Sequence, residues 1–319
     1  MPAFEASILS LHHVTATVTD AQEDLDFYAG LLGLRLVKKT VNFDNHHVFH
    51  FYYGDELGTP GTIWTTFPYK GYRVPIGLKG AGQINETAFS VPAGSLATWR
   101  RRLTEGGVVI QSEGIRLGEP YLTVADPSGL NLELIETAVD ARPPWTGAGV
   151  GAEMAVHGIH SVTLTVREAA RSIGFLTDVL GWRVIGQSGH RARLSIGTGG
   201  PGKTIDILHE PDAPAAMNGL GTVHHVAMAI GTAEEQLEAR EALLRLGVAV
   251  TEVRDRQYFL SIYFREPGGV LYEIATMKPG FAVDEPPARL GVELKLPPWE
   301  EPYRKEIEAG LPSVTVPGQ

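Results

Sequence analysis

An internal repeat is the feature that most constrains the fold of this 319-residue chain. When the sequence is shifted by 148 residues, His12–Val37 aligns with His160–Ile185 without a gap, and ten of the 26 positions are identical. In each copy an alternating apolar run, a helical pattern and a second apolar run follow one another, which predicts strand, helix, strand. Gly33 and Gly181 fall where the end of a helix favours glycine.

Two weaker copies follow the same plan. Residues 87–91 and 226–230 alternate like strands, and each run leads into a helical stretch, at 95–105 and 233–246. The sequence therefore predicts an α+β chain built from four βαβββ modules.

A Pro/Gly-rich stretch at residues 140–149 separates the second module from the third. We therefore expect an N-terminal domain of two modules at 1–145 and a C-terminal domain of two modules at 146–319. The segment after Lys278 is rich in proline and irregular, and we expect it to fold back over the body of the protein.

Composition excludes several classes of function. The net charge is −10 and no basic block occurs, so we expect no nucleic-acid partner. No apolar run reaches the length of a membrane span, and the N-terminus lacks the pattern of a signal peptide, so we expect a cytoplasmic protein without membrane contact. The chain has no cysteine, so any metal must be held by His, Asp or Glu.

Two histidine doublets and one glutamate are the candidate metal ligands. The doublets His12-His13 and His224-His225 each open an alternating apolar run, and Glu273 lies in a third run after a glycine pair. Two imidazoles and one carboxylate on three strands have the makeup of a facial triad, which leaves coordination positions of Fe(II) open for substrate and dioxygen.

The combination of four modules, a histidine that heads a first strand and a glutamate after a Pro-Gly-Gly turn resembles the vicinal oxygen chelate superfamily. This superfamily includes glyoxalase I, extradiol ring-cleaving dioxygenases and antibiotic-resistance proteins. The runs at 55–62 and 206–212 resemble its hydroquinone-type ring-cleaving dioxygenase branch, and the run at 36–43 is similar to a bacterial subgroup linked to quinone stress. The resemblance implies two half-barrel-like mixed sheets with flanking helices.

The resemblance also implies roles for individual residues. In the superfamily the ligand precedes a Val-Thr or Val-Ala pair, which selects His13 and His225 to bind Fe(II) with Glu273; Mn(II) is an alternative, because the same ligands serve both metals. Further catalytic residues are implied at His12, His224, Arg256 and Tyr263. Neighbours on a strand point to opposite faces, so His12 and His224 can reach the site only at a strand end or a bulge.

The implied activity is an Fe(II)-dependent dioxygenase that opens the ring of a hydroquinone or catechol. Its partners would be a small aromatic substrate and dioxygen, and a homo-oligomer is left open. Two alternatives remain: a glyoxalase-like isomerase or lyase, and a non-catalytic binding or resistance protein. Glyoxalase-like sites commonly use four protein ligands with an acid at the end of each module, and residues 62–67 contain no acid.

The repeat predicts which modules share the site. The positions in modules two and three that match the candidate ligands are Glu86, Ser161 and Glu133, without an imidazole. We therefore expect the site to join the first and last modules, so that the two halves interlock. His50 could line a pocket, but the sequence assigns no chemical role to His50 or to His209.

Overall fold

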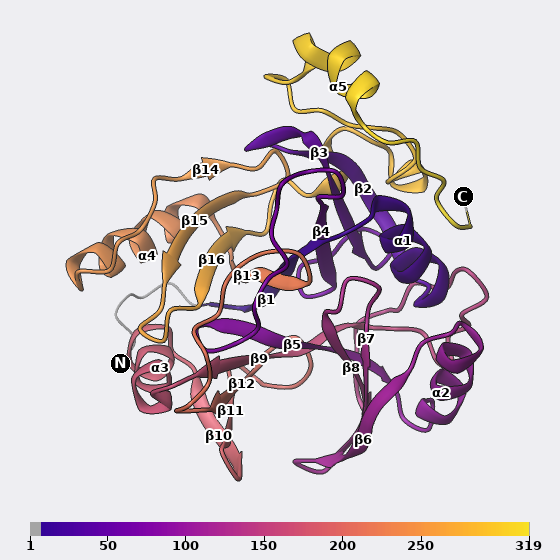
Figure 1. Cartoon of the computed structure of the whole chain (residues 1–319). Helices are drawn as coiled ribbons and strands as arrows, with labels where there is room; N and C mark the ends of the chain where they lie inside the picture. Colours follow the sequence, from indigo (N-terminus) through magenta and orange to yellow (C-terminus); the bar gives the residue numbers. More distant parts are fainter. Residues whose placement is uncertain (1–7, 319) are drawn as a thin grey trace.

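The computed structural model describes residues 8–318, which form two eight-stranded mixed sheets (Figure 1). The first sheet has the strand order β14-β15-β16-β13-β1-β4-β3-β2. Its strands are β1 (Ser10–Val18), β2 (Arg35–Asn42), β3 (Asn45–Gly54), β4 (Ile63–Pro68), β13 (Thr222–Ile230), β14 (Arg254–Asp255), β15 (Leu260–Arg265) and β16 (Leu271–Thr276).

The second sheet has the order β10-β11-β12-β9-β5-β8-β7-β6. Its strands are β5 (Gln83–Pro92), β6 (Ile110–Arg116), β7 (Glu119–Ala125), β8 (Asn131–Thr137), β9 (Gly158–Val166), β10 (Arg183–Ser188), β11 (Arg191–Ser195) and β12 (Thr204–His209). The first sheet thus combines modules one and four, and the second combines modules two and three. The expected α+β fold and the interlocking of the halves are confirmed. The domain boundary at residue 145 stays a prediction, and each sheet contains strands from both sides of it.

Short helices connect the first and second strands of the modules. They are α1 (Ala21–Leu25) with η1 (Asp26–Leu31), α2 (Leu96–Glu105), α3 (Ala169–Gly174) with η2 (Phe175–Val179), and α4 (Ala233–Arg245). Gly33 and Gly181 follow two of these helices with φ values of 69° and 76°, a left-handed conformation that costs glycine least. No helix within residues 8–318 is long and apolar enough to cross a membrane.

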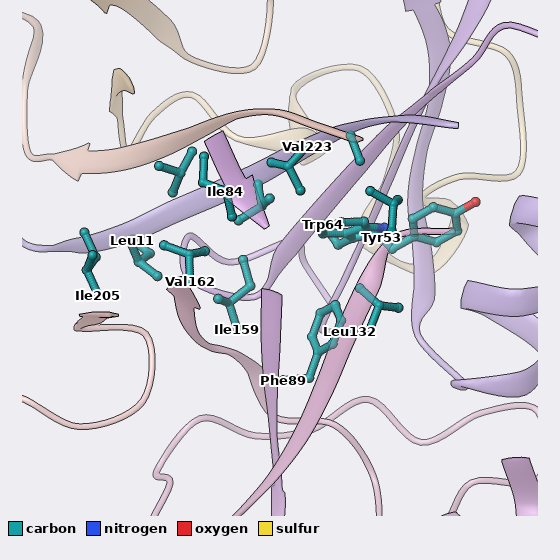
Figure 2. Close-up of a cluster of buried hydrophobic side chains, with 14 of the residues drawn as sticks. Leu11, Tyr53, Trp64, Ile84, Phe89, Leu132, Ile159, Val162, Ile205 and Val223 are labelled. Carbon is teal, nitrogen blue, oxygen red and sulfur yellow. The ribbon is translucent and has the colours of Figure 1, made fainter. Parts of the chain in front are cut away.

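One hydrophobic core lies between the two sheets (Figure 2). Leu11 and Val223 of the first sheet meet Ile84 and Val162 of the second, and all four side chains are at most 4% exposed. Because successive residues of a strand face opposite sides, the alternate residues of β1 and β13 point away from this core. That other face of the first sheet is where the candidate ligands lie.

The C-terminal segment runs along β2 and β3, as expected (Figure 1). It contains the short helices η3 (Phe281–Val283), η4 (Pro287–Arg289), η5 (Glu301–Tyr303) and α5 (Arg304–Gly310). Lys38 of β2 is fully buried, and its ammonium group contacts the carboxylates of Asp284 and Glu285. A buried ion pair therefore attaches the segment to the edge of the sheet.

We predict that Lys38→Met destabilises the protein by about 3 kcal/mol, because removal of Lys38 leaves the buried carboxylate of Glu285 without a cationic partner. Urea unfolding followed by circular dichroism measures the change. Lys70→Met is the control, since Lys70 pairs with Asp20 at the surface and its side chain is 70% exposed; it should leave the unfolding midpoint unchanged. Equal midpoints for the two variants would contradict the prediction.

Candidate metal centre

The three expected ligands come together on neighbouring strands. His13 lies on β1, His225 on β13 and Glu273 on β16, and Ala227 of β13 lies across from both His13 and Glu273. The Nε2 atoms of the two histidines are 3.3 Å apart. Glu273 Oε2 is 3.3 Å from His13 Nε2 and 2.8 Å from His225 Nε2. Within residues 8–318 this is the only cluster of His, Cys, Asp or Glu ligand atoms close enough to hold a metal ion.

Two β-bulges explain how both histidines of each doublet reach the site. The pairing of β1 with β13 shifts at His12 and again at His224, so each of these residues is an extra one without a partner on the opposite strand. An extra residue interrupts the alternation of side chains and re-aims them. The neighbouring imidazoles consequently lie together, with His12 Nδ1 2.9 Å from His13 Nδ1 and His224 Nδ1 2.7 Å from His225 Nδ1.

These contacts leave the Nε2 atoms of His13 and His225 free to face a cation. A histidine ligand commonly donates its other ring N–H to a neighbouring acceptor, which sets its tautomer and orientation. Burial above all lowers the pKa of His12 and that of His224 to about 3, so both are neutral acceptors at neutral pH. Burial likewise lowers the pKa of His225, so this histidine is in the neutral form that a metal requires.

Glu273 carries the negative charge of the site. Its side chain is fully buried, Ser261 Oγ donates a hydrogen bond to Oε1, and Oε2 has no hydrogen-bond donor. Burial raises the pKa of Glu273, but the neighbouring imidazoles of His13 and His225 outweigh it and hold the pKa well below its usual range, so the carboxylate is ionised. A buried carboxylate oxygen without a donor is costly, so this oxygen suits a bound cation.

The spacing of the ligand atoms fits a small divalent ion. Ligands in adjacent coordination positions at about 2.1 Å from a metal are about 3 Å apart, close to the distances in this cluster. His13 and His225 also line a cavity of about 260 Å³, so the side of the cluster away from the strands is open. The other residues that line this cavity are Thr15, Thr17, Asn42, Phe43, Asp44, His50, Tyr52, Phe67, Tyr69, His224, Arg256, Phe259 and Tyr263.

Arg256 and Tyr263 lie together at the wall of this cavity. Arg256 Nε donates to the Tyr263 hydroxyl oxygen at 3.1 Å, and Nη2 is 3.1 Å from Oδ2 of Asp44. The Tyr263 ring packs edge-on against His225, with centroids 5.6 Å apart. Burial is the main cause that raises the pKa of Tyr263, so its hydroxyl keeps its proton and can donate it toward the cavity.

The two remaining expected residues occupy different places. His224 lines the cavity, whereas His12 lies behind His13, is 2% exposed and packs against Phe259 with centroids 4.9 Å apart. The structure thus places His224 where it can touch a ligand and His12 where it can act only through His13.

Three residues of the site did not come from the sequence. Ser261 holds Glu273, Asp44 holds Arg256, and Phe259 covers His12 and His13. Ser261 alternates with Tyr263 on β15, so an i, i+2 pattern could have suggested it. Asp44 lies in the turn between β2 and β3, and no local signal connects it to Arg256, 212 residues later in the chain.

The matching positions of the second sheet show what replaces a cation there. Arg116 Nη1 donates to both carboxylate oxygens of Glu133, at 2.9 and 2.8 Å, and Arg191 Nη2 donates to Glu86 at 2.8 Å. Ser161 contacts His160 at 2.9 Å. Guanidinium groups therefore neutralise the two acids at the positions of the second sheet that match the ligand cluster.

A larger cavity lies elsewhere. It has a volume of about 580 Å³, is lined by η1 and the loop after α2, and includes Phe27, Val108 and Pro127. No histidine lines it, so its volume alone does not mark it as the site of chemistry. His209 is also remote from the cluster: its ring contacts the backbone carbonyl of Arg167.

The chain is similar to known proteins over most of its length. The chain is 42% identical over 303 residues to MhqO of Bacillus subtilis, by name a ring-cleaving dioxygenase, and the match covers 95% of this chain and 96% of that protein. It is 36% identical over 305 residues to the chlorohydroquinone/hydroquinone 1,2-dioxygenase of Sphingobium indicum, which covers 93% of this chain and 94% of the relative.

A crystal structure described as a dioxygenase from Bacillus subtilis superposes with a TM-score of 0.93 at 40% identity, and the match covers 98% of this chain and 99% of that one. Residues 10–134 and 158–274 match the model of one family. The chain therefore belongs to the glyoxalase/bleomycin resistance protein/dioxygenase superfamily.

Proposed function

We propose that this protein is a dioxygenase that cleaves the ring of a hydroquinone or catechol at a divalent metal held by His13, His225 and Glu273. The observation that carries the proposal is the convergence of three buried ligand atoms beside a cavity of about 260 Å³, which is small enough to suit a one-ring aromatic compound. The names of the relatives support the same class of reaction. Fe(II) is the proposed metal, and Mn(II) is the alternative.

The metal would lower the pKa of a coordinated phenol and bring the ring and dioxygen together. The residues of the chain supply the rest. Phe259, Phe67 and Tyr52 form apolar parts of the cavity wall and limit the access of water. Arg256 stabilises the negative charge that develops when a carbon–carbon bond beside a hydroxyl breaks and both oxygen atoms enter the product.

Two residues that line the cavity can hold or move protons there. Nδ1 of His224 faces the Nδ1–H of His225, so neutral His224 carries its own proton on Nε2. The Tyr263 hydroxyl oxygen accepts from Arg256, so its hydrogen is available to a bound oxygen atom. Both groups thus act as donors toward substrate or dioxygen.

A glyoxalase-like reaction is disfavoured by the register of the strands. Ala227 of β13 pairs with Glu273 of β16, and by the repeat the matching pair on β1 and β4 is Thr15 with Thr65. Thr65 therefore stands where a fourth, acidic ligand would be expected. A three-ligand site leaves more positions open, as a reaction of substrate with dioxygen requires.

The ligand assignment predicts that Glu273→Gln loses bound metal. An amide has no negative charge to offset a divalent cation, so we expect the molar ratio of metal to protein to fall at least tenfold. The ratio is measured by inductively coupled plasma emission spectroscopy after the protein has been loaded with Fe(II) or Mn(II) and desalted. Glu133→Gln, at the same position of the second sheet, should keep the wild-type content. Full metal occupancy in Glu273→Gln would refute the assignment.

The activity predicts dioxygen uptake by protein loaded anaerobically with Fe(II). Hydroquinone, methylhydroquinone, chlorohydroquinone and catechol are offered in turn while an oxygen electrode and the aromatic absorbance are followed. Uptake equimolar with the loss of aromatic absorbance is expected for at least one compound. If none is consumed although iron is bound, a redox-neutral reaction at the same site becomes the better proposal.

The position of His12 predicts an indirect effect on the metal. His12→Ala removes the acceptor that orients His13, so metal affinity should fall by about tenfold or more while the fold is retained. Competition with a chromophoric chelator measures the affinity. His160→Ala is the matched control, since His160 occupies the equivalent position of the second sheet and is equally buried. An equal loss of metal affinity in both variants would point to a general structural effect.

A further inference from the structure

His50 is a polar residue of the cavity that the proposed reaction does not use. It lies on β3, is 9% exposed, and its ring is packed between Tyr52 and Phe67, with centroid distances of 4.0 and 4.2 Å. It lines the same cavity as His13 and His225. An imidazole held rigidly at the wall of a substrate-sized cavity can recognise a polar atom of the substrate.

A chain of hydroxyl groups determines which nitrogen of His50 carries the proton. Thr65 Oγ1 donates its one hydrogen to Thr15 Oγ1 at 2.9 Å, and His50 Nε2 is 3.0 Å from Thr65 Oγ1. The Thr65 oxygen can then only accept from His50, so Nε2 carries the proton. Burial also lowers the pKa of His50, which keeps the ring neutral. Nδ1 is consequently an acceptor.

This acceptor is open to the cavity. Within residues 8–318, Nδ1 of His50 forms no hydrogen bond, and it is not one of the polar atoms sealed from solvent. Two other polar groups of the same wall are already engaged: Asn42 donates to Tyr69 at 3.0 Å, and Asp44 contacts Arg256. His50 Nδ1 is therefore available to a donor on a bound molecule.

The strand register places His50 away from the ligand cluster. His225 pairs with Thr15, Thr15 with Thr65 and Thr65 with Tyr52, in a row across β13, β1, β4 and β3. Neighbouring strands are about 4.8 Å apart, so β3 is three strand spacings from the strand of His225. His50 precedes Tyr52 by two residues and lies on the same face of β3. Thr65, which occupies the position where a fourth ligand would be expected, is the residue that orients His50.

We propose that His50 selects substrates with two para hydroxyl groups, by accepting a hydrogen bond at Nδ1 from the hydroxyl that lies farther from the metal. This inference rests on the proposed function. A 1,4-dihydroxybenzene with one oxygen at the ligand cluster directs its second hydroxyl toward the opposite wall. A catechol has both oxygens on one edge of the ring and presents only C–H groups to His50, whose acceptor then loses its partner.

The test measures equilibrium binding in the absence of dioxygen, so that it does not depend on turnover. Hydroquinone and 4-methylphenol have similar shapes, but only hydroquinone has the second hydroxyl. We expect Mn(II)-loaded wild type to bind hydroquinone about tenfold more tightly, as one hydrogen bond in a buried site allows. His50→Phe keeps an aromatic ring between Tyr52 and Phe67 and should bind both compounds equally. Isothermal titration calorimetry gives the affinities.

Two further variants separate recognition from packing. His47→Phe, on the same strand but at an exposed position, should keep the tenfold preference. Thr65→Val removes the group that orients His50 without touching substrate, and should reduce the preference part of the way. It also serves as the test if His50→Phe fails to fold. In turnover, His50→Phe should lower the ratio of kcat/KM for hydroquinone over catechol by about tenfold, mainly through KM.

Failure of the His50 proposal and failure of the proposed ring cleavage give different results. A wild type that binds the two phenols equally, or a His50→Phe variant that keeps the preference, overturns the role of His50 even if rings are cleaved. A wild type that prefers hydroquinone in binding but consumes no dioxygen with any compound overturns the proposed reaction and leaves the recognition by His50 supported.

Discussion

The antiparallel pairing of β1 with β13 is the constraint on which the metal centre depends. Regular alternation would send His12 and His13 to opposite faces of the sheet, and likewise His224 and His225. The two bulges in this pairing place an extra residue beside each ligand, so that a ligand and its hydrogen-bond acceptor share one face. The same kind of bulge thus occurs twice, and each bulge brings one ligand atom together with the group that orients it.

The second sheet shows that this geometry belongs to the fold and does not need the metal. The pairing of β5 with β9 has shifts at the equivalent places, at Asn85 and at His160. The bulges are kept there although Glu133 is paired with Arg116 and no imidazole ligand remains. The scaffold is therefore duplicated, and only the side chains placed on it decide whether a site can bind a cation.

Much of this could be predicted from local patterns, and the rest depends on contacts between distant segments. Alternation and the repeat predicted four modules and their interlocking, and the resemblance to the superfamily then selected His13 and His225 from the two doublets. The link from Asp44 to Arg256 could not be predicted, because it depends on how a turn of module one meets a loop of module four. The same holds for His50, whose tautomer depends on hydroxyl groups of two other strands.

The charges around the two equivalent glutamates explain why one sheet suits a metal and the other does not. In the second sheet, Arg116 supplies the positive charge that the buried Glu133 requires. In the first sheet the nearby guanidinium, that of Arg256, is held by Asp44 and Tyr263 instead, and Oε2 of Glu273 has no hydrogen-bond donor. A buried carboxylate needs a cationic partner, and a histidine that binds a metal must be in its neutral form, which cannot be that partner. A divalent ion satisfies the carboxylate and both Nε2 atoms together, because these three atoms lie 2.8 to 3.3 Å apart, the spacing of adjacent ligands around one small cation.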